Sequence, residues 1–274
     1  VLTAKGLETF HGLDHLMNQL LGIKDDEKRL ATHLEIDHCL VVSGDADQSS
    51  RVLDELGKTL NSTLQLLLPP GHLTIAVMGG TTMAHLASQL TFQLSAGREL
   101  SFVPARGGLG EAVTIQANSI AAAMAEATDS KYRALYVPEN LSSESYESLI
   151  KEPSVKEVLT LIDKAQVVIH SVGDALVMAK RRGMSPDTIR MLKAKHAVAE
   201  AFGVFYDAEG KVVYKIPQIG LQLADLDHIP YVFAVAAGKS KAKAIAAYMQ
   251  HAPSRTWLLT DVGATNSILT GATR

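Results

Sequence analysis

Apolar residues recur along this chain in two patterns, which together predict alternating strands and helices. Six short runs rich in β-branched or aromatic residues show almost no alternation with polar residues, which is typical of strands buried on both faces of a sheet. These runs are 73–78, 100–103, 134–137, 166–170, 232–236 and 257–259. Apolar residues at helical spacing fall between them, at 81–90, 111–127, 154–163, 175–182, 186–194 and 240–250. The order predicts an α/β fold, with a mostly parallel sheet flanked by helices.

Three further segments extend this picture. Apolar residues at helical spacing predict amphipathic helices at 7–21, as a linker or a dimerising helix, and at 50–68, before two prolines and a glycine. Residues 203–215 predict a small β-hairpin outside the main sheet, with its turn at 207–210. The sequence opens at Val1 without a methionine, so we expect a further segment upstream.

Composition and charge narrow the class of protein. With 274 residues, of which 47% are hydrophobic and 20% charged, the chain can bury a full core as one large domain or two small ones. Its formal net charge of −3 lacks the basic field of a self-contained nucleic-acid module. Any contact with DNA is therefore expected to lie in another part of the protein.

Two further compositional features bear on localisation and redox chemistry. No apolar run reaches the roughly 18 residues of a membrane span, and no signal-peptide pattern opens the chain. We therefore expect a cytoplasmic protein without a membrane partner. The one cysteine, Cys39, lies in an apolar run and is expected to be a buried structural thiol.

The carboxyl end of the first predicted strand suits an anionic ligand. The apolar run stops at Gly79, Gly80, Thr81 and Thr82, where a helical pattern begins. A helix N-terminus carries unpaired N–H donors and about half a unit of positive charge, and small residues let a phosphate approach them. The alternative is local, with a threonine capping the helix and the glycines turning the chain.

Two other strand ends carry cations in similar loops. Ligands of open α/β sheets bind at the carboxyl ends of the strands, so these loops are expected at one edge. Arg106 stands in a glycine-rich loop and can donate two hydrogen bonds to one phosphate, or can simply face solvent. A second glycine–hydroxyl helix start follows 232–236, with Gly238, Lys239, Ser240 and Lys241. The loops together predict one ligand with two phosphates, or one phosphate held from two sides.

Polar side chains near these loops have local and functional interpretations. Gln116 follows the arginine loop and is favoured over Asn118 as a partner for a sugar hydroxyl. Asp174 follows the predicted strand at 166–170 and is expected to cap the next helix. Arg181 and Arg182 end that helix, where positive charge interacts favourably with the helix dipole.

The catalytic patterns that would make this site an active centre are missing from the sequence. Glu200, a lone carboxylate among apolar residues, suits a sugar hydroxyl or the role of a general base. We find no paired carboxylates, no histidine placed against a nucleophile and no metal-ligand spacing among the ten histidines. The sequence therefore predicts binding of a phosphorylated compound without turnover, metal or cofactor. The alternatives are a sugar-phosphate isomerase or deaminase with Glu200 as its base, and a structural oligomerisation domain.

Four segments resemble the SorC-type family of sugar-binding transcriptional regulators. They are 79–82, 102–111, 152–159 and 200–203, and the Pro-Ala-Arg-Gly-Gly stretch that begins at Pro104 is the most specific. The resemblance covers most of the chain from about residue 36 onward. It implies a Rossmann-like effector domain that is related to sugar-phosphate isomerases and deaminases but is not catalytic.

The resemblance also implies partners and an effector. Family members repress glycolytic operons through an N-terminal winged-helix domain. Residues 1–6 resemble the end of such a wing, so the rest of that domain is expected outside this chain. The expected division is therefore the end of that region and a linker helix at 1–20, and an effector-binding domain at 21–274. The expected effector is fructose 1,6-bisphosphate or a related glycolytic phosphosugar, whose binding would rearrange the subunits of a dimer or tetramer and so weaken operator binding.

The same resemblance implies a set of ligand-binding residues. They are Gly79, Gly80, Thr81, Thr82, Arg106, Gln116, Arg181, Arg182, Glu200 and Lys241, with Gly238, Lys239 and Ser240 beside them. Arg181 and Arg182 enter this set through the resemblance alone. Around Gly238 the sequence departs from the family, whose members typically carry a glycine pair and a less charged turn.

Overall fold

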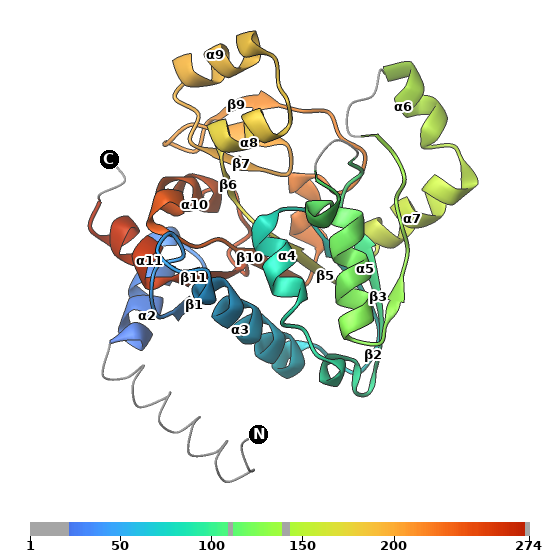
Figure 1. Ribbon diagram of the computed structural model, residues 1–274, viewed down its shortest axis with the longest axis horizontal. Coiled ribbons are helices and arrows are strands. Elements are labelled where there is room, and N and C mark those ends of the chain that lie inside the picture. The colour runs from blue at the N-terminus through green and yellow to red at the C-terminus, as the bar shows by residue number, and fades with distance from the viewer. Residues whose placement is uncertain (1–21, 109–111, 139–142, 272–274) are drawn as a thin grey trace.

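The computed structural model describes residues 22–108, 112–138 and 143–271, and its main feature is a parallel sheet (Figure 1). In chain order the strands are β1 (His38–Val42), β2 (Gly71–Val77), β3 (Arg98–Pro104), β4 (Lys131–Tyr132), β5 (Val167–His170), β10 (Tyr231–Val235) and β11 (Trp257–Asp261). In space their order is β1-β11-β10-β5-β2-β3-β4, and every neighbouring pair is parallel. The predicted α/β class with a mostly parallel sheet is confirmed.

Helices cover both faces of this sheet. On one face lie α3 (Arg51–Leu67), α4 (Thr81–Ala87) and α5 (Ala117–Ala127), and on the other lie α2 (Ile23–Leu34), α7 (Pro153–Asp163), α10 (Ala242–Met249) and α11 (Val262–Leu269). All four residues of β5 are buried, because Val167 and Ile169 pack under α3 to α5 while Val168 packs on the opposite side. Burial on both faces explains why the strand sequences lack alternation.

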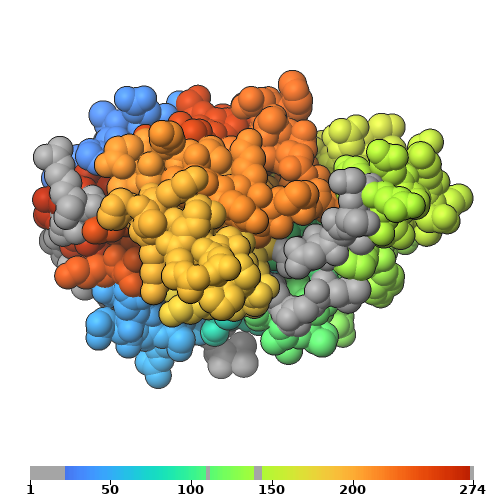
Figure 2. Space-filling view, turned by 90° about the horizontal axis from the view of Figure 1, so that it is seen from above, coloured from blue at the N-terminus to red at the C-terminus, as the bar shows by residue number. Residues whose placement is uncertain are grey.

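A second, antiparallel sheet of four strands lies beyond the carboxyl ends of the first. It contains β6 (Gly173–Asp174), β7 (Ala199–Ala201), β8 (Val204–Tyr206) and β9 (Val212–Lys215). The predicted hairpin is β8 and β9, and the structure extends it by two strands. Val204 and Tyr206 point into the main core, whereas Phe205 packs on the other side under α8 (Ala175–Arg181) and α9 (Pro186–Ala194). Figure 2 looks down on this layer, in gold and orange.

One predicted strand is wrong. Residues 134–137 form no strand, although Leu135 and Val137 are buried, and the edge strand is β4 at Lys131–Tyr132 instead. The side chain of Asn118 replaces the missing ladder: its Nδ2 donates to the carbonyl of Leu135 at 2.9 Å and its Oδ1 accepts from the N–H of Leu135 at 2.9 Å. An apolar run can therefore be buried without a neighbouring strand.

Some other predictions can be compared with the structure only in part. Helices α2, α11 and α6 (Ser143–Leu149) form where none was predicted, and short 3₁₀ turns occur at η1 (Phe92–Ser95), η2 (Val113–Ile115), η3 (Leu223–His228) and η4 (Lys239–Lys241). The predicted helix at 7–21 and the proposed wing residues lie outside the described residues. Cys39 is buried as expected, and burial raises the pKa of its thiol well above its ordinary value. Among the residues described, no helix is long and apolar enough to cross a membrane.

Candidate functional site

A cavity of about 200 Å³ opens at the carboxyl edge of the main sheet. Strands β10, β5, β2 and β3 are consecutive in the sheet, so the loops that follow them lie side by side. Ten of the predicted ligand residues line this cavity: Gly79, Gly80, Thr81, Thr82, Arg106, Arg181, Arg182, Glu200, Ser240 and Lys241. Gln116, Gly238 and Lys239 are not part of its lining. Gln116 lies behind Gly79, at the start of α5.

The loop after β2 forms the first wall. Gly80 has φ 128°, which disfavours any other residue, and its N–H donates to the carbonyl of Ile115 at 2.8 Å. A Cβ on Gly79 would lie 2.7 Å from that same oxygen, so both glycines are required by the close approach of the two segments. The N–H groups of Thr81 and Thr82 follow in the first turn of α4, where they have no intrahelical partners and no side-chain cap.

Arg106, on the second wall, is held through its backbone. The residue is 5% exposed and forms an isolated antiparallel bridge with Gly220. On either side of it, the N–H of Gly107 donates to Ile219 at 3.0 Å and the N–H of Leu221 donates to Ala105 at 2.7 Å. The segment between β9 and η3 therefore holds the arginine loop beside the cavity through these backbone hydrogen bonds.

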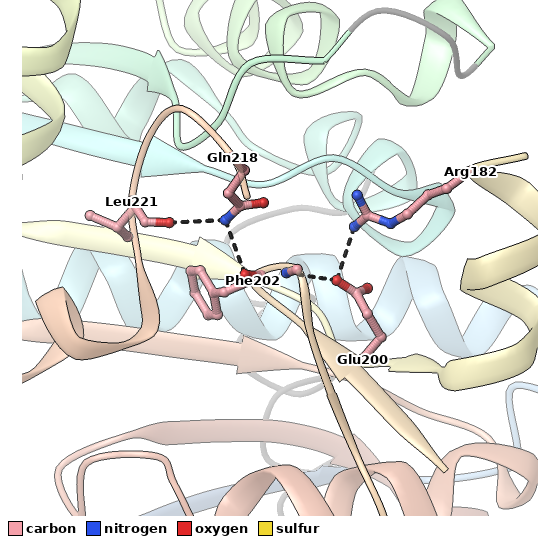
Figure 3. A network of polar contacts seen from close by, with 6 residues as sticks. Arg182, Glu200, Phe202, Gln218 and Leu221 are labelled. Atoms are coloured by element: carbon pink, nitrogen blue, oxygen red, sulfur yellow. Dashed lines mark hydrogen bonds and ion pairs between the residues drawn. The ribbon is translucent and has the colours of Figure 1, made fainter. Parts of the chain in front are cut away.

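The third wall comes from α8 and β7. Asp174 caps α8 by accepting from the N–H of Val177 at 2.8 Å, which confirms the predicted cap. Arg182 Nη2 donates to Glu200 Oε1 at 2.9 Å, and the two side chains are only 4% and 5% exposed (Figure 3). The same Glu200 oxygen accepts from the N–H of Gly203 at 2.8 Å. Glu200 therefore fixes an arginine and the β7–β8 turn at once.

Gln218 was not predicted as a site residue, yet it connects two of these walls. Its Nε2 donates to the carbonyl of Phe202 at 3.0 Å and to the carbonyl of Leu221 at 3.1 Å (Figure 3). Phe202 lines the cavity, and Leu221 belongs to the segment that holds the arginine loop. No local sequence pattern marks this role, because both partners are main-chain carbonyls.

The loop after β10 differs from the open cradle that its sequence predicts. The N–H groups of Gly238, Lys239 and Ser240 donate to the carboxylates of Asp261, Asp45 and Asp47 at 2.9, 3.2 and 2.6 Å. These donors are therefore occupied within the protein, and of the three residues only Ser240 lines the cavity.

Lys241 is the cation that this loop does bring to the cavity. Its Nζ donates to Thr82 Oγ1 at 3.2 Å, so it joins the loops after β10 and β2. Burial lowers the pKa of Lys241 and the charge of Arg181 lowers it further, whereas Asp47 and Asp261 raise it. Burial, Arg181 and the two carboxylates together determine whether the amine of Lys241 is protonated.

A buried histidine lies directly beneath the cavity. His170 ends β5, and its Nε2 is 3.1 Å from the hydroxyl of Tyr248 while its ring centroid is 4.8 Å from that of Phe202. Burial lowers the pKa of His170 from 6.5 to about 4, so the imidazole is neutral near pH 7.

We expect the free energy of unfolding to fall as the pH is lowered from about 6.5 to about 4. Across this window the unfolded chain binds a proton at His170 and the folded chain does not, and the full difference is about 3 kcal/mol. Urea unfolding at several pH values would measure it. The variant His170→Gln keeps a hydrogen-bonding group without titrating, so its curve should be flatter; parallel curves for the two proteins would contradict this account.

The described residues show no obvious metal site. Within these parts of the chain, no group of three or more His, Cys, Asp or Glu side chains is placed to hold a metal ion. The polar lining of the cavity contains three arginines, one lysine and the first turn of α4, together with the carboxylates of Asp174 and Glu200.

A family model, curated relatives and solved structures all relate this chain to sugar-binding transcriptional regulators. The family model for sugar-binding domains, Sugar-bind, matches residues 19–270. The chain is 44% identical, over 268 residues, to the central glycolytic genes regulators of Bacillus subtilis (strain 168) and Priestia megaterium, covering 98% of this chain and 78% of each relative. A crystal structure described as a SorC family transcriptional regulator from Enterococcus faecalis is 59% identical, with a TM-score of 0.85, covering 89% of this chain and 99% of that one.

Proposed function

We propose that this chain, which belongs to the family of sugar-binding domains found in SorC-type transcriptional regulators, senses a phosphosugar in the cavity at the carboxyl edge of its main sheet. Its family and relatives make it the sugar-binding domain of a transcriptional regulator of glycolytic genes. The effector proposed here is fructose 1,6-bisphosphate or a related glycolytic phosphosugar.

The observation that carries this proposal is the convergence of positive groups from separate elements on one small cavity. Arg106 comes from the loop after β3, Arg181 from α8 and Lys241 from the loop after β10, and the first turn of α4 lines the same space with Thr81 and Thr82. In a chain with a net charge of −3 such a concentration of donors calls for an anion. Glu200 and the hydroxyls of Thr81 and Thr82 add partners for sugar hydroxyls.

Binding without turnover is the second part of the proposal. The carboxylate of Glu200 is engaged by Arg182 and by the N–H of Gly203, which suits a structural and hydroxyl-binding group better than a proton-transfer base. The relatives are named as regulators, not as enzymes. The competing function, a sugar-phosphate isomerase or deaminase, requires turnover.

Control of transcription is proposed to run through parts outside residues 21–274. An N-terminal winged-helix domain would contact operator DNA in the cytoplasm, and residues 1–20 would link it to this domain in a dimer or tetramer. The effector must bind the non-repressing state more tightly, because a ligand shifts an equilibrium only through its different affinities for the two states. Each tenfold preference shifts the equilibrium by about 1.4 kcal/mol.

A thermal-shift screen of glycolytic phosphosugars tests the proposal. At a hundred times its dissociation constant a ligand adds about 2.7 kcal/mol, which at this chain length raises Tm by roughly 5 to 10 °C. Fructose without phosphate should give no shift, and phosphorus NMR of the same mixtures should show the phosphosugar unchanged. Consumption of the phosphosugar would favour the enzyme, and the absence of any shift would rule out the sensor.

A further inference from the structure

We propose that the carboxylates of Asp45 and Asp47, which lie against the loop after β10 beside the cavity, act as resident anions that weaken phosphate binding in the cavity and prevent this loop from binding a second phosphate. The inference rests on the proposed phosphosugar site and concerns residues that the family resemblance did not bring into it. Both residues lie in the loop between β1 and α3, about 190 positions before the loop that they contact.

Carboxylates accept hydrogen bonds from the backbone donors of the loop after β10. Asp47 Oδ2 accepts from the N–H of Ser240 at 2.6 Å, and its Oδ1 accepts from the hydroxyl of Ser240 at 2.8 Å. Asp45 Oδ1 accepts from the N–H of Lys239 at 3.2 Å. Asp261 Oδ2 completes the set with the N–H of Gly238 at 2.9 Å. Backbone N–H groups in a glycine-containing turn are the donors that usually hold a phosphate, and here carboxylates hold them.

The packing around two glycines accommodates the carboxylates of Asp45 and Asp47 in this loop. A Cβ on Gly238 would lie 2.5 Å from Asp47 Oδ1, and a Cβ on Gly263 would lie 2.5 Å from the Cγ of Asp45. The N–H of Gly263 also donates to the carbonyl of Gly44 at 3.0 Å. Each aspartate therefore rests against a glycine that leaves room for its carboxylate.

The ammonium of Lys241 is surrounded by charges of both signs. The groups that face the ammonium of Lys241 are Thr82 from α4, Arg181 from α8, Asp261 at the end of β11, and Asp47. The two carboxylates attract this ammonium, so a phosphate must compete with them for it. Asp261 is fully buried and caps α11, whereas Asp47 is exposed, so Asp47 is the carboxylate that can be changed with least risk to the fold.

Neutralising Asp47 is therefore expected to strengthen phosphate binding. Asp47→Asn keeps an oxygen acceptor for Ser240 and removes the charge. With fructose 6-phosphate as the probe, calorimetry at pH 6.5 and low salt should show about threefold tighter binding than the wild type, since solvent screens an exposed charge. The gain should shrink in about 0.5 M salt, where the Debye length is only a few ångströms. Asp207→Asn, which removes an equal charge from a carboxylate that also accepts a backbone N–H, is the matched control and should bind as the wild type does.

A pH profile separates this role from simple support of the loop. Asp47 raises the pKa of Lys241, so in Asp47→Asn the loss of binding at alkaline pH should begin at a lower pH. Asp45→Asn provides a second variant, which should also bind the probe more tightly because the Asp45 carboxylate holds the N–H of Lys239 in the same loop. Equal or weaker binding by both folded variants at pH 6.5 would overturn the proposal, since loop support alone predicts weaker binding. If the wild type itself binds no phosphosugar, the proposed function fails, and this inference fails with it.

Discussion

Replacing Lys241 by methionine is expected to weaken phosphosugar binding about ten- to hundredfold and to leave the fold intact. A hydrogen bond to a charged group contributes about 1.5 to 3 kcal/mol, and 1.4 kcal/mol corresponds to a factor of ten in affinity. Lys241 also joins two walls of the cavity through Thr82, so its loss removes both a charge and a positioning contact. Burial already disfavours the charged ammonium, so the apolar stem of methionine should be well tolerated.

The matched control for this variant stands two residues earlier. Lys239→Met removes an equal charge from the same turn, but Lys239 is exposed and its side chain is not part of the cavity lining. Calorimetry should therefore show near wild-type affinity for Lys239→Met. Arg106→Ala should weaken binding as Lys241→Met does. Unchanged affinity in both Lys241→Met and Arg106→Ala would exclude this cavity as the phosphosugar site.

The largest effect on stability is expected from Arg182→Met. The Arg182–Glu200 pair is almost completely buried, so removal of the arginine leaves a buried carboxylate whose remaining hydrogen bond, among the residues that the structure describes, is to the N–H of Gly203. Leaving one charge of a buried pair uncompensated costs about 3 to 5 kcal/mol, which corresponds to a fall in Tm of roughly 10 °C. Urea unfolding and calorimetric melting would both measure the loss.

Two further variants show whether the cost comes from the unpaired carboxylate. The double variant Arg182→Met with Glu200→Gln should recover most of the stability, because its glutamine oxygen still accepts from Gly203 without a buried charge. Arg190→Met breaks an exposed pair with Asp187, and no measurable change is expected. Wild-type stability in Arg182→Met, or no recovery in the double variant, would show that the pair does not behave as a buried ion pair.

The fold and several loops that line the cavity could be predicted from the sequence because their signals are local. The end of β2 shows a buried apolar run, two glycines and a helix start within ten residues, and each feature has one physical cause. The same holds for Asp174, whose position before α8 predicts the cap that the structure contains. Parallel order then brings the loops to one edge, because all strands of the main sheet point the same way.

The remaining features depend on partners that are distant in sequence. The run at 134–137 has the composition of a strand, yet the backbone N–H and carbonyl of Leu135 are satisfied by the side chain of Asn118. The loop at Gly238 has the composition of a phosphate cradle, yet two of its donors are held by carboxylates about 190 residues earlier and a third by Asp261, and no local pattern marks these partners. Gln218 binds only main-chain carbonyls, so its residue type alone gives no indication of its role.

The layer formed by α8 and α9 rests on a small apolar cluster of its own. Five fully packed apolar residues form that cluster, namely Ala175, Ala179, Leu192, Ala197 and Phe205, whereas the main sheet is buried between two much larger clusters. Segments with small cores open at a lower free energy than the body that carries them. Arg181 belongs to this layer, and Lys241 lies in the loop after β10 of the main sheet. A molecule bound to both residues would therefore connect the layer to the sheet. The chain would then convert the concentration of a small molecule into the rigidity of one surface layer, at little cost to the fold beneath it.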